Sequence, residues 1–244
     1  MRRLTGGPQH PLTLTINGFR QRPLMQERVA ARFDFSTDSL SGVMADASVM
    51  DRYGLTPEQS MALFFNDSYD FYWNASPASV VEKVGAHYLD VWNSGRKAKA
   101  EALGLSPAEV MTIASIVDEE TNALEEKGTI GRLYVNRLRT GMPLQADPTV
   151  RFALGDFSIR RVTSAMTRTP HPYNTYVNKG LPPGPIRTTS VQTIDAILDS
   201  APHDYLYMCA KADFSGRHAF AKTYAEHQVN ARRYKRELDR RGIH

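Results

Sequence analysis

The spacing of apolar residues predicts one strand and three helices in the first hundred residues. Residues 12–16 alternate apolar and polar positions, and a period of two predicts a strand. Helical spacing predicts helices near 24–33 and 40–53. A third helix should begin at Ser76 and Pro77, a pair typical of a helix start, and its apolar side carries Val80, Val81, Val84, Tyr88 and Trp92.

The next helix contains the most informative pattern of the chain. Ser106, Pro107 and Glu109 form a helix-start signature. At 3.6 residues per turn, Glu120 shares the apolar side of this helix, whereas Asp118 and Glu119 are predicted to face solvent. The other members of the apolar side are Ile113, Ile116, Val117, Ala123 and Leu124.

A carboxyl group on an apolar face points to proton chemistry. Burial disfavours the charged form, so the pKa of Glu120 should rise and the proton should stay on near neutrality. This is the profile of a general acid. The alternative is that Glu120 lies at a lobe boundary and pairs with an arginine such as Arg132 or Arg137.

The second half of the chain is rich in turn signals. A helix near 130–139 should end at Gly141, and Asp147 before Pro148 predicts another helix start with Asp147 as the N-cap. Prolines and glycines in 173–186 stiffen a loop that carries polar side chains, which is typical of binding clefts. We expect this loop to face Glu120; a stiff connection between elements is the alternative.

The last forty residues predict two strands and a helix. Residues 205–210 and 217–221 read as a strand pair, and a helix with a basic face follows from about Tyr224. Strands and helices do not alternate in the βαβ manner. We therefore predict an α+β fold, with a helical N-terminal lobe at 1–104 and a second domain at 105–244 of helices packed on a small antiparallel sheet.

Composition narrows the possible functions. With 244 residues, 41% of them hydrophobic, the chain can bury a full core as one large domain or two small ones. A net charge of +4 is too small to indicate nucleic acid, and no nucleic-acid motif is present. A single cysteine, Cys209, excludes an internal disulfide and a cysteine-based metal cluster. No apolar run is long enough to span a bilayer, and the opening at 1–8 is more typical of a truncated start than of a native leader.

An aromatic run at 64–73 has two interpretations. Sugar rings pack on aromatic faces, so the run could form a sugar-stacking wall. Such runs are more often core and rim.

Several short motifs, in a fixed order through the second half, resemble one known family. The motifs are Ala-Ser-Ile-Val-Asp-Glu-Glu-Thr at 114–121, Asn-Arg-Leu at 136–138, Leu-Gln-Ala-Asp-Pro-Thr at 144–149, Tyr-Asn-Thr-Tyr at 173–176, Gly-Leu-Pro-Pro-Gly-Pro-Ile at 180–186, Tyr-Leu-Tyr at 205–207 and His-Ala-Phe at 218–220. The family that they resemble is the endolytic murein transglycosylases, whose usual Pro-Asp-Thr-Tyr element stands here as Asn-Asp-Ser-Tyr at 66–69.

The resemblance implies a reaction and a site. The family's catalytic glutamate directly precedes a threonine and falls on Glu120. It would act as general acid and base in cleaving the β-1,4 bond from N-acetylmuramic acid to N-acetylglucosamine, leaving a 1,6-anhydro end without cofactor or metal. The implied substrate-binding residues are Gln145, Asp147, Asn174, Thr175, Tyr176 and His218.

The resemblance also implies a location and partners. Family members are typically tethered to the inner membrane by one N-terminal helix, with a small LysM-like domain before the catalytic part. We therefore expect the chain to be the part exposed on the periplasmic face of the inner membrane, with at most a remnant of the small domain. Its expected partners are peptidoglycan glycan strands and enzymes of cell-wall synthesis, with no nucleic acid.

Two other classes remain open. One is a lysozyme-type hydrolase with Asp118 or Asp147 as the second carboxylate, although Asp118 lies about 200° around the helix from Glu120. The other is a non-enzymatic glycan-binding scaffold that uses the aromatic run and the basic helix. Anhydro ends, reducing ends or no released product would separate the three classes.

Overall fold

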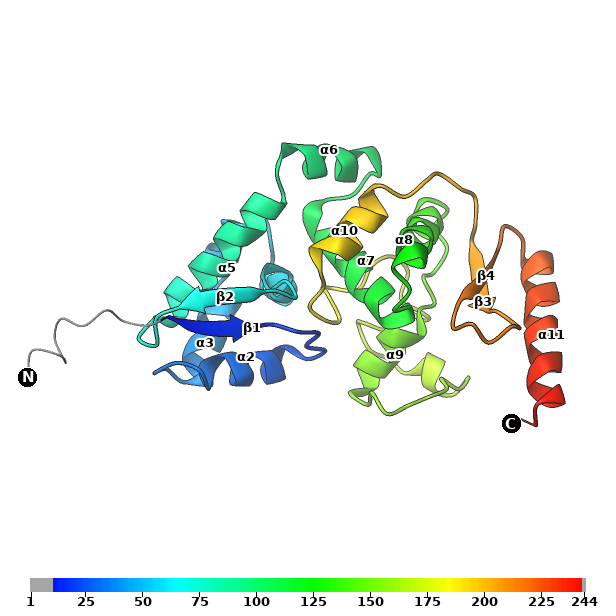
Figure 1. Ribbon diagram of the computed structural model, residues 1–244, viewed down its shortest axis with the longest axis horizontal. Coiled ribbons are helices and arrows are strands. Elements are labelled where there is room, and N and C mark those ends of the chain that lie inside the picture. Colours follow the sequence, from blue (N-terminus) through cyan, green and yellow to red (C-terminus); the bar gives the residue numbers. More distant parts are fainter. Residues whose placement is uncertain (1–10, 243–244) are drawn as a thin grey trace, which may run out of the picture. The chain divides into compact units, whose positions relative to one another are not determined.

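The computed structural model describes residues 11–242, which form two compact units (Figure 1). The first unit comprises 11–93 with Arg187–Val191, and the second comprises Ser94–Ile186 and 192–242. The division lies before the predicted boundary at 104/105, so α6 (Ser94–Ala102) belongs to the second unit. Within that unit, Arg96 of α6 forms an ion pair with Asp195. The assignment of a function to each domain stays a prediction, and the expectation drawn from 1–8 lies outside the described residues.

The first unit places helices around a two-stranded antiparallel sheet. Strand β1 (Leu12–Thr15) pairs with β2 (Ser68–Phe71), so that Leu12 lies opposite Phe71. This confirms the strand that alternation predicted. The helical elements are α2 (Arg22–Ala30), α3 (Thr37–Ala45), α4 (Ala47–Asp51), a 3-10 helix (Pro57–Leu63) and α5 (Pro77–Val91).

One predicted helix of this unit is divided in two. The apolar spacing at 40–53 predicted a single helix, but α3 ends at Ala45 and α4 begins at Ala47. Asp46, between them, has extended backbone angles, and its carboxylate accepts a hydrogen bond of 2.8 Å from the amide of Ser48. Aspartate stabilises a helix N-terminus better than a helix interior, so a new helix starts there.

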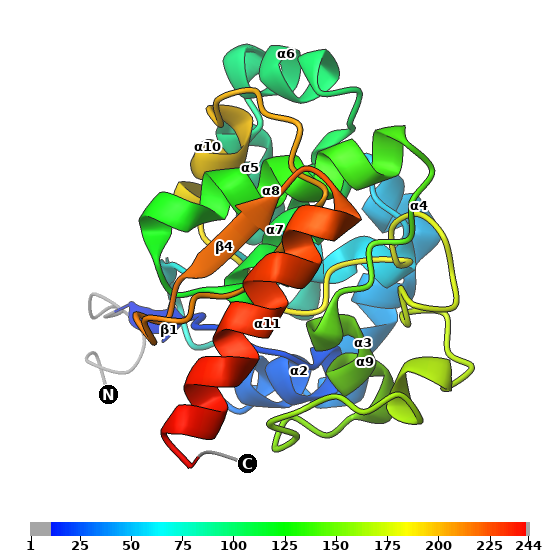
Figure 2. The ribbon, with the colours of Figure 1, turned by 90° about the vertical axis from the view of Figure 1, so that its right-hand side faces the viewer.

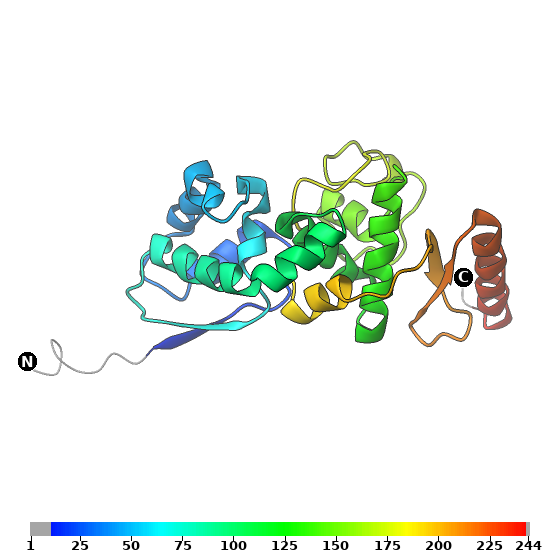
Figure 3. The same ribbon diagram turned by 90° about the horizontal axis from the view of Figure 1, so that it is seen from above.

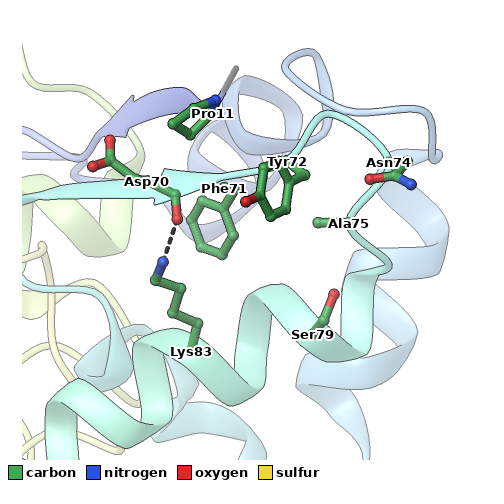
Figure 4. Close-up of a pocket in the computed structure, with 8 residues that line it drawn as sticks. All are labelled: Pro11, Asp70, Phe71, Tyr72, Asn74, Ala75, Ser79 and Lys83. Carbon is green, nitrogen blue, oxygen red and sulfur yellow. Dashed lines mark hydrogen bonds between the residues drawn. The ribbon is translucent and has the colours of Figure 1, made fainter. Parts of the chain in front are cut away.

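The aromatic run at 64–73 is divided between core and surface. Its first members, Phe64 and Phe65, are fully buried, whereas Tyr72 and Trp73 are 53% and 54% exposed. Beside Tyr72, a pocket of about 470 Å³ opens between the end of β2 and α5 (Figure 4). Four of the six aromatic rings in the run therefore serve as core, and two rings remain available at the surface.

The second unit is built around one central helix. Helix α7 (Pro107–Glu120) lies beside α8 (Leu124–Arg139) and α10 (Val191–Leu198), and its Asp118 contacts both (Figures 1 and 2). Helix α9 (Asp147–Leu154) also packs against α7, and a short 3-10 helix (Met166–Arg168) follows α9. Residues 110–118 of α7 are all buried, so α7 has no solvent face over this stretch.

The C-terminal segment forms a hairpin and a helix. Strands β3 (Tyr207–Ala210) and β4 (His218–Ala221) pair in antiparallel fashion, and α11 (Tyr224–Arg240) packs on them (Figure 3). Both observed sheets are two-stranded and antiparallel within 11–242. The prediction of an α+β fold is confirmed.

Candidate active site

A capping box determines where α7 begins. The Ser106 hydroxyl accepts a hydrogen bond of 3.3 Å from the amide of Glu109, and the Glu109 carboxylate accepts one of 2.7 Å from the amide of Ser106. The predicted helix start is confirmed. The helix ends at Glu120, because Thr121 has extended backbone angles, so three consecutive acids occupy its last turn.

Glu120 is held by a tyrosine of the neighbouring helix. The hydroxyl of Tyr134, on α8, donates a hydrogen bond of 2.7 Å to Oε1 of Glu120. Arg132 and Arg137, the partners considered from sequence, instead donate to main-chain oxygens of Ser200 and Leu206. The alternative in which one of these arginines forms an ion pair with Glu120 is therefore not observed.

Opposing influences act on the proton of Glu120. Burial is the largest of them and raises the pKa of this carboxyl group above its ordinary value. The hydrogen bond from Tyr134 lowers this pKa and the negative charge of Asp147 raises it. Electrostatic interactions with His218 and with the positive charge of Arg151 lower it. The net shift is upward, as the apolar spacing predicted.

The predicted solvent exposure of Asp118 is wrong. Its carboxylate is buried between α8 and α10, where Lys127 lies at 2.6 Å and the Thr193 hydroxyl donates a hydrogen bond of 2.7 Å. The helical wheel placed Asp118 correctly about the axis of α7, but α10 covers that side. Glu119, also predicted to face solvent, is only partly exposed.

Asp147 begins α9 but does not cap it with its side chain. The N-cap position is taken by Ala146, and Asp147 is the first helical residue. Its carboxylate accepts a hydrogen bond of 2.6 Å from the hydroxyl of Tyr176. The predicted helix start is confirmed. The predicted capping role is wrong, because the carboxylate of Asp147 binds the hydroxyl of Tyr176 in the 173–186 loop and not an amide of α9.

The 173–186 loop is attached to both α7 and α9. The amide of Ile186 donates a hydrogen bond of 3.0 Å to the Ser115 hydroxyl of α7. Burial raises the pKa of Tyr176, and the charges of Asp147 and Glu120 raise it further. The loop therefore reaches the surroundings of Glu120, while its role as one wall of a substrate cleft stays a prediction.

Two residues predicted to bind substrate are buried inside this loop. Asn174 donates hydrogen bonds to the carbonyls of Thr167 and Thr169, and Thr175 exchanges hydrogen bonds with Ala146 and Thr149. Both side chains are at most 1% exposed. Their observed contacts hold the loop in place.

The other predicted substrate-binding residues are more accessible. Gln145 is exposed and has a left-handed backbone (φ 48°), while its amide bonds to the Thr175 carbonyl. His218, on β4, contacts Glu126 through both its main chain and its ring, with the Nδ1 atom 3.1 Å from Oε2. Its hydrogen bonds with residues in 11–242 are those of the main-chain amide and of Nδ1, so the Nε2 atom forms none with them.

Sequence reasoning missed three residues of this site. Tyr134 could have been suspected, because a tyrosine on the apolar side of a helix needs a partner for its hydroxyl. Glu126 and Arg151 carry no such signal, since each acquires its neighbours from a distant part of the chain.

The described residues show neither a metal cluster nor a single membrane-spanning helix. No group of three or more His, Cys, Asp or Glu in 11–242 is arranged to hold a metal ion. Over the same residues no one helix is long and apolar enough to cross a membrane, although the bent pair α6 and α7, at 77°, meets the length and composition criteria together. The expectation that no cofactor is required stays a prediction.

Comparisons with known proteins agree on one family. The sequence model of the YceG-like family matches residues 1–233. The endolytic murein transglycosylase of Bacillus subtilis is 35% identical over 147 residues, which is 60% of this chain and 39% of that protein. The protein of that name from Streptococcus pneumoniae serotype 2 is 32% identical over 130 residues, or 52% of this chain and 23% of its own length.

A solved structure shares the fold. The crystal structure of a YceG-like protein from Listeria monocytogenes is 27% identical and superimposes with a TM-score of 0.73. The match covers 90% of this chain and 75% of that one. The chain thus matches less than half the length of the curated relatives named above.

Proposed function

Because the chain belongs to the YceG-like family, we propose that it is an endolytic lytic transglycosylase that cleaves the glycan strands of peptidoglycan. The observation that carries this proposal is the carboxyl group of Glu120, whose pKa is raised chiefly by burial and which is held by the Tyr134 hydroxyl. A carboxyl group with a raised pKa keeps its proton to a higher pH than usual and can donate it to a leaving oxygen. The names of the Bacillus and Streptococcus relatives support the same reaction class.

The proposed reaction needs one carboxyl group in two protonation states. Glu120 donates its proton to O4 of N-acetylglucosamine as the bond from C1 of N-acetylmuramic acid breaks. The resulting carboxylate then takes the proton of the muramyl C6 hydroxyl as its oxygen attacks C1. The products are a free 4-hydroxyl and a 1,6-anhydro ring, and Glu120 recovers its proton. Because the nucleophile belongs to the substrate, no water has to be ordered in the site.

The surroundings of Glu120 suggest separate roles for the other predicted residues. We assign contact with the sugar to Gln145, Tyr176 and His218, because Gln145 is exposed and the other two residues are partly exposed. Asp147 would orient Tyr176 through their hydrogen bond. Asn174 and Thr175 would act indirectly, by holding the loop that carries Tyr176.

A hydrolase is the second candidate function. The negative charge of Asp147 acts on Glu120, as a second carboxylate in a glycosidase would. In that case Asp147 would activate a water molecule and the products would carry reducing ends. Asp118 is a poorer candidate because Lys127 and Thr193 already occupy its carboxylate.

Location and partners are part of the proposal. We place the protein at the periplasmic face of the inner membrane, held by a single-pass anchor, and beside enzymes that polymerise glycan strands. These assignments rest on the family alone. Fractionation of cells that produce the full-length protein, followed by crosslinking, would test both.

Mass spectrometry of digested peptidoglycan tests the reaction. Wild-type protein should release fragments with anhydromuramyl ends, and Glu120→Gln should lower this release about a hundredfold or more. Glu119→Gln, the same change at the adjacent acid, is the matched control and should keep most activity. Reducing ends would establish the hydrolase, and binding without release would establish a scaffold.

A further inference from the structure

Arg151 carries a positive charge that forms no ion pair with any residue in 11–242. It lies on α9, one helical turn after Asp147. Its Nε atom is buried and forms no hydrogen bond, and its guanidinium group has no ion pair with any residue in 11–242. Asp147, the nearest acid along the helix, accepts the hydroxyl of Tyr176 instead.

An unpaired buried guanidinium donor is uncommon in folded proteins. Buried N–H groups almost always have a partner, and those that lack one call for a ligand, a water molecule or a functional explanation. A bound group with oxygen acceptors would satisfy the free donors of Arg151. The planar guanidinium matches a carboxylate best, because two parallel hydrogen bonds can form at once.

The position of Arg151 associates it with the proposed reacting group. Helix α9 packs against α7, which carries Glu120 at its end. The positive charge of Arg151 lowers the pKa of Glu120, so the two groups lie within electrostatic range. The backbone before Arg151 is firmly held, since Thr149 is buried and donates a hydrogen bond of 2.7 Å to the Ala146 carbonyl.

We propose that Arg151 binds a carboxylate carried by the muramyl residue that occupies the site beside Glu120. This inference rests on the proposed function. Two carboxylates of the substrate have the required chemistry: the lactyl group on O3 of a peptide-free strand, and an acidic group of a stem peptide. Either one would make Arg151 a specificity-determining residue for charged glycan strands.

Carboxylate binding would also act on the chemistry. A bound anion offsets the positive charge that favours the ionised form of Glu120. The carboxyl group would then hold its proton more firmly in the complex than in the free protein. A substrate that carries the carboxylate would therefore prepare the acid for proton donation.

The test compares four substrates. They are strands with stem peptides and strands freed of peptides by an amidase, each with carboxylates left free or converted to methylamides. We expect methylamide formation to lower kcat/KM of the wild-type protein about tenfold, mainly through KM, as for the loss of one good polar contact. A loss confined to peptide-free strands identifies the lactyl group, and a loss confined to stem-bearing strands identifies the stem peptide.

Arg151→Met should remove this discrimination while still forming anhydro ends. Arg151→Lys should restore part of it, because the charge remains and the paired hydrogen bonds do not. Arg160→Met, at an exposed arginine, is the matched control and should discriminate as the wild type does. Equal rates of the wild type on free and methylamide strands, or unchanged discrimination in Arg151→Met, would overturn the inference.

A binding measurement separates this inference from the proposed function. Titration of Glu120→Gln with N-acetylmuramic acid and with its methylamide requires no turnover. Tighter binding of the acid, lost when Arg151→Met is added, would support carboxylate recognition even if wild-type protein released no anhydro product. Equal binding of the two sugars would contradict it even if the lytic reaction were established. Arg151→Gln serves the same purpose if Arg151→Met does not fold.

Discussion

The Tyr134 hydroxyl donates a hydrogen bond of 2.7 Å to Oε1 of Glu120, and this bond opposes the effect of burial on the carboxyl group. Burial favours the protonated acid, whereas a donated hydrogen bond favours the carboxylate. Tyr134 is itself buried, and burial raises its pKa well above the ordinary value. It therefore remains a neutral donor at any pH at which the protein is expected to act.

Tyr134→Phe tests the importance of this bond. Without the hydrogen bond from Tyr134, the Glu120 carboxylate that must form during closure of the 1,6-anhydro ring is less stable. The pKa of Glu120 should therefore rise further. We expect kcat/KM to fall about tenfold, the effect of one hydrogen bond to a charged group. The limb of the pH profile that reports loss of the Glu120 proton should move to higher pH.

Tyr69→Phe is the matched control for that experiment. Tyr69 is also buried, in the first unit, and its hydroxyl accepts a hydrogen bond of 3.2 Å from the amide of Phe65. The substitution should leave the pH profile in place. A profile that moved equally in both variants would show that the shift does not come from Glu120.

The raised pKa of Glu120 predicts a specific pH dependence of stability. The folded protein holds this proton above pH 4.5, the ordinary value, whereas the unfolded chain releases it there. The contribution to stability is therefore present below about 4.5 and is lost as pH rises towards the folded-state pKa. Glutamine does not titrate, so the Glu120→Gln variant does not lose this contribution as pH rises. The variant should therefore be more stable than the wild type at neutral pH, and the free energies of unfolding of the two proteins should become similar in acid.

Glu237→Gln should behave in the opposite way. Arg240 and Arg241 lower the pKa of Glu237 to about 2, so its contribution is present above the ordinary value of 4.5 and is lost as pH falls towards 2. Urea unfolding of wild type and both variants between pH 3 and 8 would measure the differences. A Glu120→Gln variant less stable than wild type at pH 7 would contradict the assigned shift.

Asp118→Asn should cost stability more than chemistry. The change leaves the Lys127 ammonium, whose side chain is 15% exposed, without its counter-charge, at a cost of about 1–3 kcal/mol. Activity per folded molecule should stay close to wild type. Asp204→Asn is the matched control, because the ion pair with Lys222 is largely exposed and its loss should leave unfolding nearly unchanged. Loss of activity without loss of stability would return Asp118 to the list of catalytic carboxylates.

Substitution by alanine should have opposite effects on stability at two glycines, Gly128 and Gly42. A Cβ atom on Gly128 of α8 would lie 2.5 Å from the main-chain oxygen of Ala196 in α10, so Gly128→Ala should destabilise by about 1–3 kcal/mol. Gly42 of α3 has nothing within 4 Å, so Gly42→Ala should stabilise by up to about 1 kcal/mol. Thermal unfolding of the two variants measures both, and a neutral Gly128→Ala would show that α8 and α10 can separate.

Local patterns of the sequence were sufficient for the starts of α5, α7 and α9, the β3 and β4 strand pair and the fold class. A capping box such as that of Ser106 and Glu109 involves residues three apart, and a strand pair joined by a short turn is also local. For the same reason the wheel located Glu120 on the apolar side of its helix. Angle about a helix axis depends only on residue spacing.

The surroundings of that helix were decided by tertiary structure. The helical wheel of α7 could not reveal that α10 covers Asp118. The residue of α10 that binds Asp118 is Thr193, which is 75 residues away along the chain. Nor could the wheel pair Asp147 with Tyr176 or bring Arg151 into electrostatic range of Glu120. The sequence by itself determined that Glu120 is the carboxyl group on the apolar side of α7. Only the packing of α8, α9, α10 and the 173–186 loop decided which partners set the pKa of that group. The reason is that desolvation and charge act through space, between parts of the chain that are distant in sequence.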